Sequence, residues 1–232
     1  MAKNDKIDRL MFWFRDEKDD LYSYTVRFVP LSMLLNRLIN KEYSGKRIKF
    51  LNIYYNTPRT FELFDKVEPD YTHSYGGHVQ HDTIFDKEDF DSKSIIEQKK
   101  YIWDSALRVL TLISKDTKNP DLDRCCKSAH KLGLESDLIE DFIILETISN
   151  IANEKIKAEL WAEFDNDRVS ARFKIFKNNV LVFNRVIDTT KSDTEFFYEM
   201  YKKIITESNG LIILKGHNEI EYLPLKIDLN KI

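Results

Sequence analysis

Hydrophobic and polar residues alternate from about residue 158 to residue 187, and this period of two predicts β-strands with one buried face. Asn178-Asn179 is a good tight-turn pair between two of the runs, so the segment is expected to form an antiparallel meander of three strands. The residues expected to face the core are Ala158, Leu160, Ala162, Phe164, Val169, Ala171, Phe173 and Ile175.

The middle of the chain follows a helical period instead. Ser94 and Glu97 have the spacing of a capping box, and the helix that they open is expected to bury one apolar stripe. Asn119 as N-cap, Pro120 as first helical residue and Gly133 as a stop predict a second helix. A third helix is expected from residue 136 to about residue 153. The first stripe comprises Ile102, Ala106, Val109, Leu110 and Ile113.

Both ends of the chain have patterns typical of sheet. Residues 10–15 and 21–29 are rich in aromatic and β-branched residues around the charged loop DEKDD, which predicts a β-hairpin, and a short amphipathic helix is expected after Pro30. Near the other end, a helix capped by Asp193 and stopped by Gly210 is expected, followed by a hairpin formed by residues 211–214 and 220–223.

These elements predict an α+β protein with antiparallel β-sheet elements at both ends of the chain: a hairpin plus helix first, and a three-stranded meander plus helix plus hairpin last. A central block of about three helices joins them. We expect a single two-lobed domain over residues 1–232, with an N-terminal α+β lobe at 1–92 and a lobe at 93–232 that holds the helical block and the meander.

Composition narrows the class of protein. A chain of 232 residues with 42% hydrophobic residues can bury a large core, and its net charge of -3 does not indicate a general nucleic-acid binder. The chain starts with polar residues, which argues against a signal peptide, and it has no long apolar run that would predict a membrane span. Its two cysteines, Cys125 and Cys126, are adjacent and suit a reducing compartment. We therefore expect a cytoplasmic protein.

Charge is unevenly distributed along the chain. Through Phe61 there are twelve basic and seven acidic residues, whereas from Glu62 to Glu97 there are three basic and ten acidic residues. The acidic segment includes residues 67–92, which have no clear period and are too many for an ordinary connection, so whether they are ordered stays open. An acidic segment rich in aromatics can meet a basic partner, although a solvated loop has the same composition.

Three of the five histidines lie close together in THSYGGHVQH, residues 72–81. Imidazoles bind zinc and other divalent transition metals, and Gly76-Gly77 would let the loop fold back on itself. This predicts an alternative function, a metal-dependent hydrolase. Histidines in a polar loop are more often simply exposed. The candidate ligands are His73, His78, His81 and Asp82.

Two other groupings invite a chemical interpretation. His130 follows Cys126 by one helical turn, as in a thiol site, but Cys126 also lies on an apolar stripe and is expected to be inert. Aromatic and basic residues of the first hairpin, such as Trp13 and Arg15, could stack on single-stranded nucleic acid, although the same residues suit a half-buried sheet. Nucleic-acid binding is therefore a second alternative.

The leading expectation is a non-enzymatic protein that binds another protein, such as an inhibitor or immunity protein that neutralises a toxin or nuclease by covering a basic surface. The chain has no phosphate-binding glycine loop, nucleophile elbow or paired C-x-x-C knuckles, and we expect no cofactor and no catalytic residue. Partner identity and oligomeric state stay open. The residues expected to contact the partner are Tyr54, Tyr55, Asp65, Glu68, Asp70, Tyr71, Tyr75, Asp86, Glu88, Asp89 and Asp91.

Overall fold

A computed structural model describes residues 6–63, 68–165, 167–194 and 197–232. Its internal contacts divide the chain into two compact units, Met1–Glu140 and Asp141–Ile232, and each is described here by itself. The broad α+β class is confirmed, since the first unit combines helices with a sheet and the second consists mainly of antiparallel strands.

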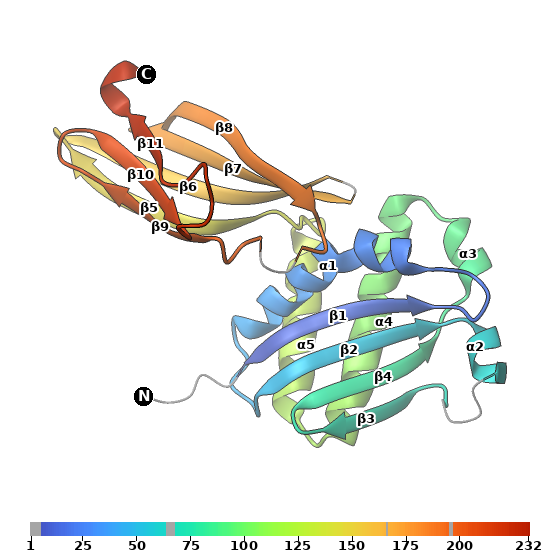
Figure 1. Ribbon diagram of the computed structural model, residues 1–232. Helices are drawn as coiled ribbons and strands as arrows, with labels where there is room; N and C mark the ends of the chain where they lie inside the picture. Colours follow the sequence, from blue (N-terminus) through green and yellow to red (C-terminus); the bar gives the residue numbers. More distant parts are fainter. Residues whose placement is uncertain (1–5, 64–67, 166, 195–196) are drawn as a thin grey trace. The chain divides into compact units, whose positions relative to one another are not determined.

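The N-terminal unit is built on a four-stranded sheet with the order β1-β2-β4-β3 (Figure 1). Strands β1, β2 and β4 run parallel, and β3 pairs antiparallel with β4 at one edge. The elements of the unit are β1 (Ile7–Arg15), α1 (Tyr22–Asn40), β2 (Ile48–Asn56), α2 (Pro58–Leu63), β3 (Tyr71–Tyr75), β4 (His78–Ile84), α3 (Lys87–Asp91), α4 (Ile95–Asp116) and α5 (Pro120–Glu135).

Helices α1, α4 and α5 cover one face of this sheet (Figure 1). The predicted apolar stripe of α4 is fully buried, and its capping box is formed, because Ser94 accepts from the Glu97 backbone while Glu97 accepts from that of Ser94. Asn119 caps α5 as predicted. Helix α5 continues past Gly133 to Glu135, however, and Gly133 packs against the Trp103 ring instead of ending the helix.

The predicted N-terminal hairpin is wrong. Residues 22–40 form the single helix α1, which crosses over to bring β2 parallel to β1. Alternation of tyrosine and β-branched residues suggested a strand, but Thr25, Phe28 and Ser32 are buried at helical spacing. Pro30 lies inside the helix, where a proline would ordinarily break it. Burial of this face against the sheet overrides the weak local preference.

The C-terminal unit is a β-sandwich in which a four-stranded sheet, β5-β6-β7-β8, shares a core with a three-stranded sheet, β11-β10-β9 (Figure 1). The predicted meander is confirmed as β6, β7 and β8, whose inward residues such as Phe173 are fully buried. The strands are β5 (Phe142–Ile151), β6 (Glu154–Asp165), β7 (Arg168–Lys177), β8 (Val180–Lys191), β9 (Tyr201–Thr206), β10 (Leu211–Gly216) and β11 (Leu225–Asp228), before a short 3₁₀ turn at Leu229–Lys231.

Two predicted helices are strands in this unit. The segment expected to be the third central helix holds β5, and the last turns of the helix expected after Asp193 hold β9, while residues 195–196 of that segment lie outside the described part. Both strands contain several isoleucines, whose β-branched side chains pack well on a pleated sheet. The final hairpin is formed by β10 and β11, slightly later than predicted.

Within the described residues, the helices are all too short or too polar to cross a membrane.

Candidate functional site

The histidine-rich segment folds into the β3–β4 hairpin, with Gly76 and Gly77 at its turn in the left-handed region of φ. His78 and His81 are an odd number of residues apart on one strand, so their side chains point to opposite faces of the sheet. His73 pairs with Gln80 and lies on the face of His78 and Asp82. The structure therefore does not bring the three imidazoles together, and the described residues contain no cluster of three or more metal-ligating side chains.

His81 belongs to a polar cluster on the helix-facing side of the sheet. Its side chain is fully buried, with Nδ1 2.9 Å from the Thr72 hydroxyl and Nε2 3.6 Å from a carboxylate oxygen of Asp70. Burial lowers the pKa of His81, and the nearby Asp70 only partly offsets this effect. A neutral, buried imidazole in this position supports the fold rather than offering a ligand to solvent.

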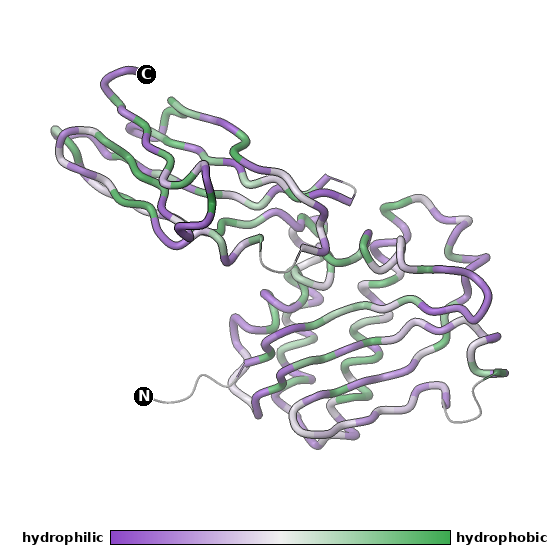
Figure 2. Tube along the Cα trace, viewed as in Figure 1, coloured by the Kyte–Doolittle hydropathy of each residue, from purple (hydrophilic) through white to green (hydrophobic). Residues whose placement is uncertain are grey.

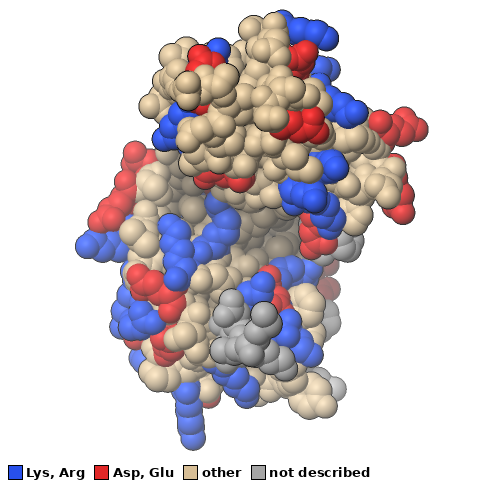
Figure 3. Space-filling model, turned by 90° about the vertical axis from the view of Figure 1, so that its left-hand side faces the viewer, with Lys and Arg blue, Asp and Glu red and all other residues tan. Residues whose placement is uncertain are grey.

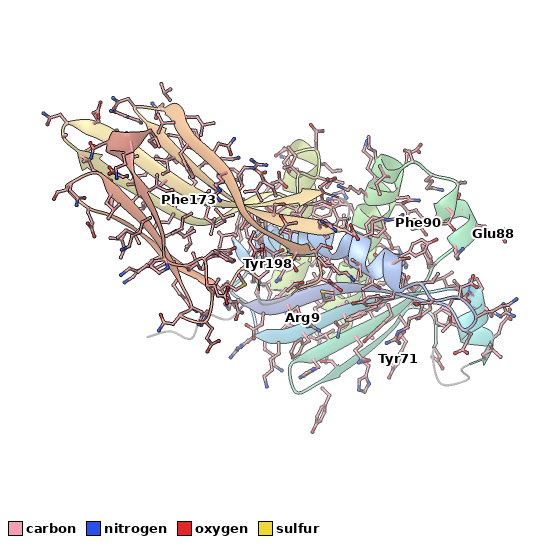
Figure 4. The ribbon with its side chains drawn as sticks, turned by 45° about the horizontal axis from the view of Figure 1, so that its top comes forward. Arg9, Tyr71, Glu88, Phe90, Phe173 and Tyr198 are labelled. Carbon is pink, nitrogen blue, oxygen red and sulfur yellow. The ribbon has the colours of Figure 1, made fainter. Side chains whose placement is uncertain are left out.

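The four tyrosines expected to contact a partner fall into three environments. Tyr55 is fully buried, with its hydroxyl 3.5 Å from the Ile102 carbonyl oxygen of α4, so it belongs to the core and cannot touch a partner. Tyr71 and Tyr75 project from edge strand β3 with 52% and 81% of their surface exposed, and Figure 4 shows Tyr71 at this edge. Tyr54 lies on the sheet face opposite Tyr55, but only 9% of its surface is exposed, and the Arg15 guanidinium lies over its ring.

Most of the acids expected to steer a partner are engaged within their own unit. Arg108 binds both carboxylate oxygens of Asp70 at 3.0 Å, and its charge and hydrogen bonds outweigh burial to lower the pKa of Asp70. On α3, Asp86 caps the helix, and Asp89 and Asp91 pair with lysines one turn away. Glu68 is exposed, as is Glu88 at the periphery of α3 in Figure 4, whereas Asp65 lies outside the described residues.

A group of stacked aromatic and basic side chains occupies the sheet face opposite the helices, which carries no helix in the described part of the unit (Figure 1). Trp13 and Tyr54 stack with ring centroids 6.4 Å apart, and the Arg15 guanidinium lies 3.6 Å from the Tyr54 centroid. We call this group the aromatic platform. Its members are Arg9, Trp13, Arg15, Phe50, Tyr54 and His78.

The strand register explains the platform. Trp13 of β1 lies beside Tyr54 of β2, and Phe50 of β2 lies beside His78 of β4, so aromatic rings are direct neighbours across the sheet. The Phe50 and His78 ring centroids are 4.7 Å apart, and the Arg9 guanidinium lies 4.9 Å from that of Phe50. Each ring thus gains support from its cross-strand partner, and the platform is held in shape before any ligand binds.

A cavity of about 600 Å³ opens where β1 and β2 reach their carboxyl ends, next to the platform. We call it the carboxyl-end pocket. Residues of loop 16–20 after β1 line it, and this loop is hydrophilic (Figure 2). Trp13 lines it as well. Its acidic lining residues are Asp16, Glu17, Asp19, Asp20 and Asp82.

These five acids form no salt bridge with the described lysines and arginines, in contrast to the acids of α3. Asp16 is held by the hydroxyl of Thr57 and by the backbone N–H groups of Lys18 and Asp19. The hydrogen bond from Thr57 is the main reason that the pKa of Asp16 is lowered. Arg15 also lines the pocket, so the five acids outnumber its cationic lining residues. Elsewhere, on the face shown in Figure 3, positive and negative side chains are interleaved.

The thiol grouping does not form a reactive site. Cys125 and Cys126 are both buried free thiols, and burial raises the pKa of each. The His130 ring instead approaches Asp104, with Nε2 2.7 Å from its carboxylate. A buried thiol with a raised pKa is a poor nucleophile.

Sequence reasoning missed the carboxyl-end pocket because DEKDD suggested a hairpin loop. The signal was nevertheless present, since four acids in five residues directly follow a strand, and ligands of parallel sheets commonly bind beyond the carboxyl ends of strands.

Comparisons with models of protein families, with curated proteins and with solved structures found no match.

Proposed function

We propose that this protein binds another protein through the aromatic platform and the acids of the carboxyl-end pocket. The observation that carries the proposal is the position of a preformed aromatic and arginine surface directly beside five acids that form no salt bridge with the described lysines and arginines. Tryptophan, tyrosine and arginine are the residues that most often dominate the energy of protein interfaces. Neighbouring acids would speed the association of a basic partner.

The acids also distinguish a protein partner from a nucleic acid. The Trp13–Tyr54 stack and Arg15 would suit an unpaired base, as in single-strand binding proteins. A phosphate backbone crossing this surface would, however, meet the carboxylates of loop 16–20 and of Asp82. A basic protein surface gains from the same charges, and an inhibitor or immunity protein that covers a basic cleft is the class that fits best.

A charge-reversal experiment tests this function. The tagged full-length chain would be used to recover partners from cells that produce it, and recovered proteins would be quantified by mass spectrometry. In the double variant Glu17→Lys/Asp19→Lys, both changed residues are exposed in loop 16–20. The matched control is Glu219→Lys/Glu221→Lys, which makes the same change of charge at exposed positions of the C-terminal unit.

We expect the partner to be recovered by the wild type and the control, and to bind the loop variant at least about tenfold more weakly, with affinity that falls as salt rises. Trp13→Ala should weaken binding as well, because it removes the central ring of the platform. Equal recovery by the loop variant and the wild type would contradict the proposal. Recovery that depends on nuclease-sensitive RNA or DNA would instead support nucleic-acid binding.

A further inference from the structure

A buried oxygen in the carboxyl-end pocket lacks a hydrogen-bond donor. Asn56 lines the pocket with only 1% of its surface exposed, and its Nδ2 donates to Oδ1 of Asp82 at 2.7 Å. Its carbonyl oxygen, Oδ1, is buried without a partner in the described part of the chain. Buried acceptors are nearly always paired, so an unpaired one in a cavity wall indicates where a ligand would donate a hydrogen bond.

The groups around this oxygen define what the ligand must be. Asp82 offers carboxylate oxygens next to the Asn56 carbonyl, and the other acids of the pocket add negative charge. Trp13 also lines the pocket and brings an aromatic side chain to it. Acceptors, negative charge and an aromatic surface together suit a cation that has several N–H donors and stacks on rings, which is the chemistry of a guanidinium group.

A neutral or anionic ligand would fit poorly. An anion would face five acids and only one cationic lining residue, Arg15, whose guanidinium lies over the Tyr54 ring. The hydrogen bond from Thr57 also lowers the pKa of Asp16, which favours its charged form. An ammonium group would satisfy the charge, but it has no flat face to lie against the Trp13 ring. The pocket volume of about 600 Å³ is ample for the end of an arginine side chain.

We propose that the carboxyl-end pocket binds a guanidinium group, which an arginine side chain of the protein partner inserts between Trp13, Asn56 and Asp82. That the guanidinium group belongs to a partner protein rests on the proposed function. That the pocket binds a guanidinium group rests on the residues of the pocket alone. In this arrangement the guanidinium donates to the free Asn56 oxygen and to Asp82, while one face lies against the indole.

The test uses methylguanidinium as the probe and methylurea as its neutral counterpart of similar shape. Each would be titrated into the ¹⁵N-labelled full-length chain while the indole N–H signals of its three tryptophans are followed by NMR. We expect a saturable shift of the Trp13 signal with methylguanidinium and at least tenfold weaker binding of methylurea. The signals of Trp103 and Trp161 serve as internal controls, since neither lines the pocket.

Three variants make the result specific. Asp82→Asn keeps the size of the side chain and an oxygen for Asn56, removes the charge, and should weaken methylguanidinium binding at least tenfold. Should it fail to fold, Asp19→Asn in the exposed loop should still weaken binding severalfold. Glu88→Gln, an exposed acid of α3 outside the pocket, should leave binding unchanged.

A shift that does not saturate, equal binding of methylurea, or full binding by folded Asp82→Asn or Asp19→Asn would overturn the assignment. These results are independent of partner recovery. If a partner is recovered but methylguanidinium does not bind, the proposed arginine pocket is wrong and the proposed function is still supported. If methylguanidinium binds saturably but no protein partner is recovered, the proposed guanidinium site is supported and the proposed function is contradicted.

Discussion

Lowering the pH from 7.5 to 5.0 should destabilise the N-terminal unit through His81. This side chain is fully buried beside Thr72 and Asp70, and burial lowers its pKa below the ordinary 6.5. Above pH 6.5 the imidazole is neutral in both the folded and the unfolded chain. As the pH falls from 6.5 toward the lowered folded pKa, the unfolded chain binds a proton that the folded chain does not, so stability falls.

The magnitude has an upper limit. One proton bound only by the unfolded chain changes the free energy of unfolding by about 1.4 kcal/mol per pH unit, so a histidine that stays neutral in the fold accounts for about 2 kcal/mol at most between pH 7.5 and 5.0. Asp70 acts against this loss, because it lies 3.6 Å from Nε2 and would stabilise the charged ring. The pKa of Asp70 is itself lowered from 3.8, so its own titration falls below this pH range.

Urea unfolding of the full-length chain at several pH values measures this effect. A Trp161→Phe background would restrict tryptophan fluorescence to Trp13 and Trp103, which both lie in the N-terminal unit. The comparison is with His81→Gln, which cannot titrate in this range. We expect a fall of up to about 2 kcal/mol between pH 7.5 and 5.0 that is absent from the variant. An equal fall in both proteins, or a stability that rises toward pH 5.0, would show that His81 does not cause the pH dependence.

Two further predictions concern the helical layer. Gly133→Ala should lower stability by up to about 2 kcal/mol, measured by urea unfolding. An added Cβ would lie 2.2 Å from Cζ2 of the buried Trp103, and overpacking costs about 1–3 kcal/mol against a gain of about 1 kcal/mol in helix propensity. The exposed Lys131→Ala in the same helix should stay within about 0.5 kcal/mol, and an unchanged or higher midpoint for Gly133→Ala would show that the ring moves freely. Separately, iodoacetamide should modify Cys125 and Cys126 far more slowly in the native protein than in urea, as followed by mass spectrometry, because burial raises the pKa of both thiols. Similar rates in the two conditions would mean that these thiols are accessible in the native protein.

Elements with strong local signals could be predicted from the residues alone. The capping box at Ser94 and Glu97 and the N-cap at Asn119 place two helices, and the alternation between residues 158 and 187 places three strands. In these segments the period, the caps and the turn residues agree with one another.

Other elements depended on long-range contacts. The first strands and helices contain aromatic and β-branched residues that suit either a strand or a buried helix, and only packing against the sheet decides in favour of α1. The same holds for β5, whose residues become a strand by pairing with β6. The intrinsic helix or strand propensity of these segments is weak compared with the free energy of burying a whole apolar face. Packing against the core therefore decides their secondary structure.

The residue pattern alone predicts the α+β class, two of the three expected central helices, the meander, and the kinds of side chain available for binding. Only the tertiary structure decided which of them share a surface. Strand parity sends His81 to the core and leaves His78 outside, and it separates Tyr54 from its neighbour Tyr55. The parallel pairing of β1 and β2 brings Trp13 beside Tyr54 and the acids after β1 beside Asn56. Such neighbours are far apart in the chain, and their proximity follows from strand order and register, which no local pattern encodes.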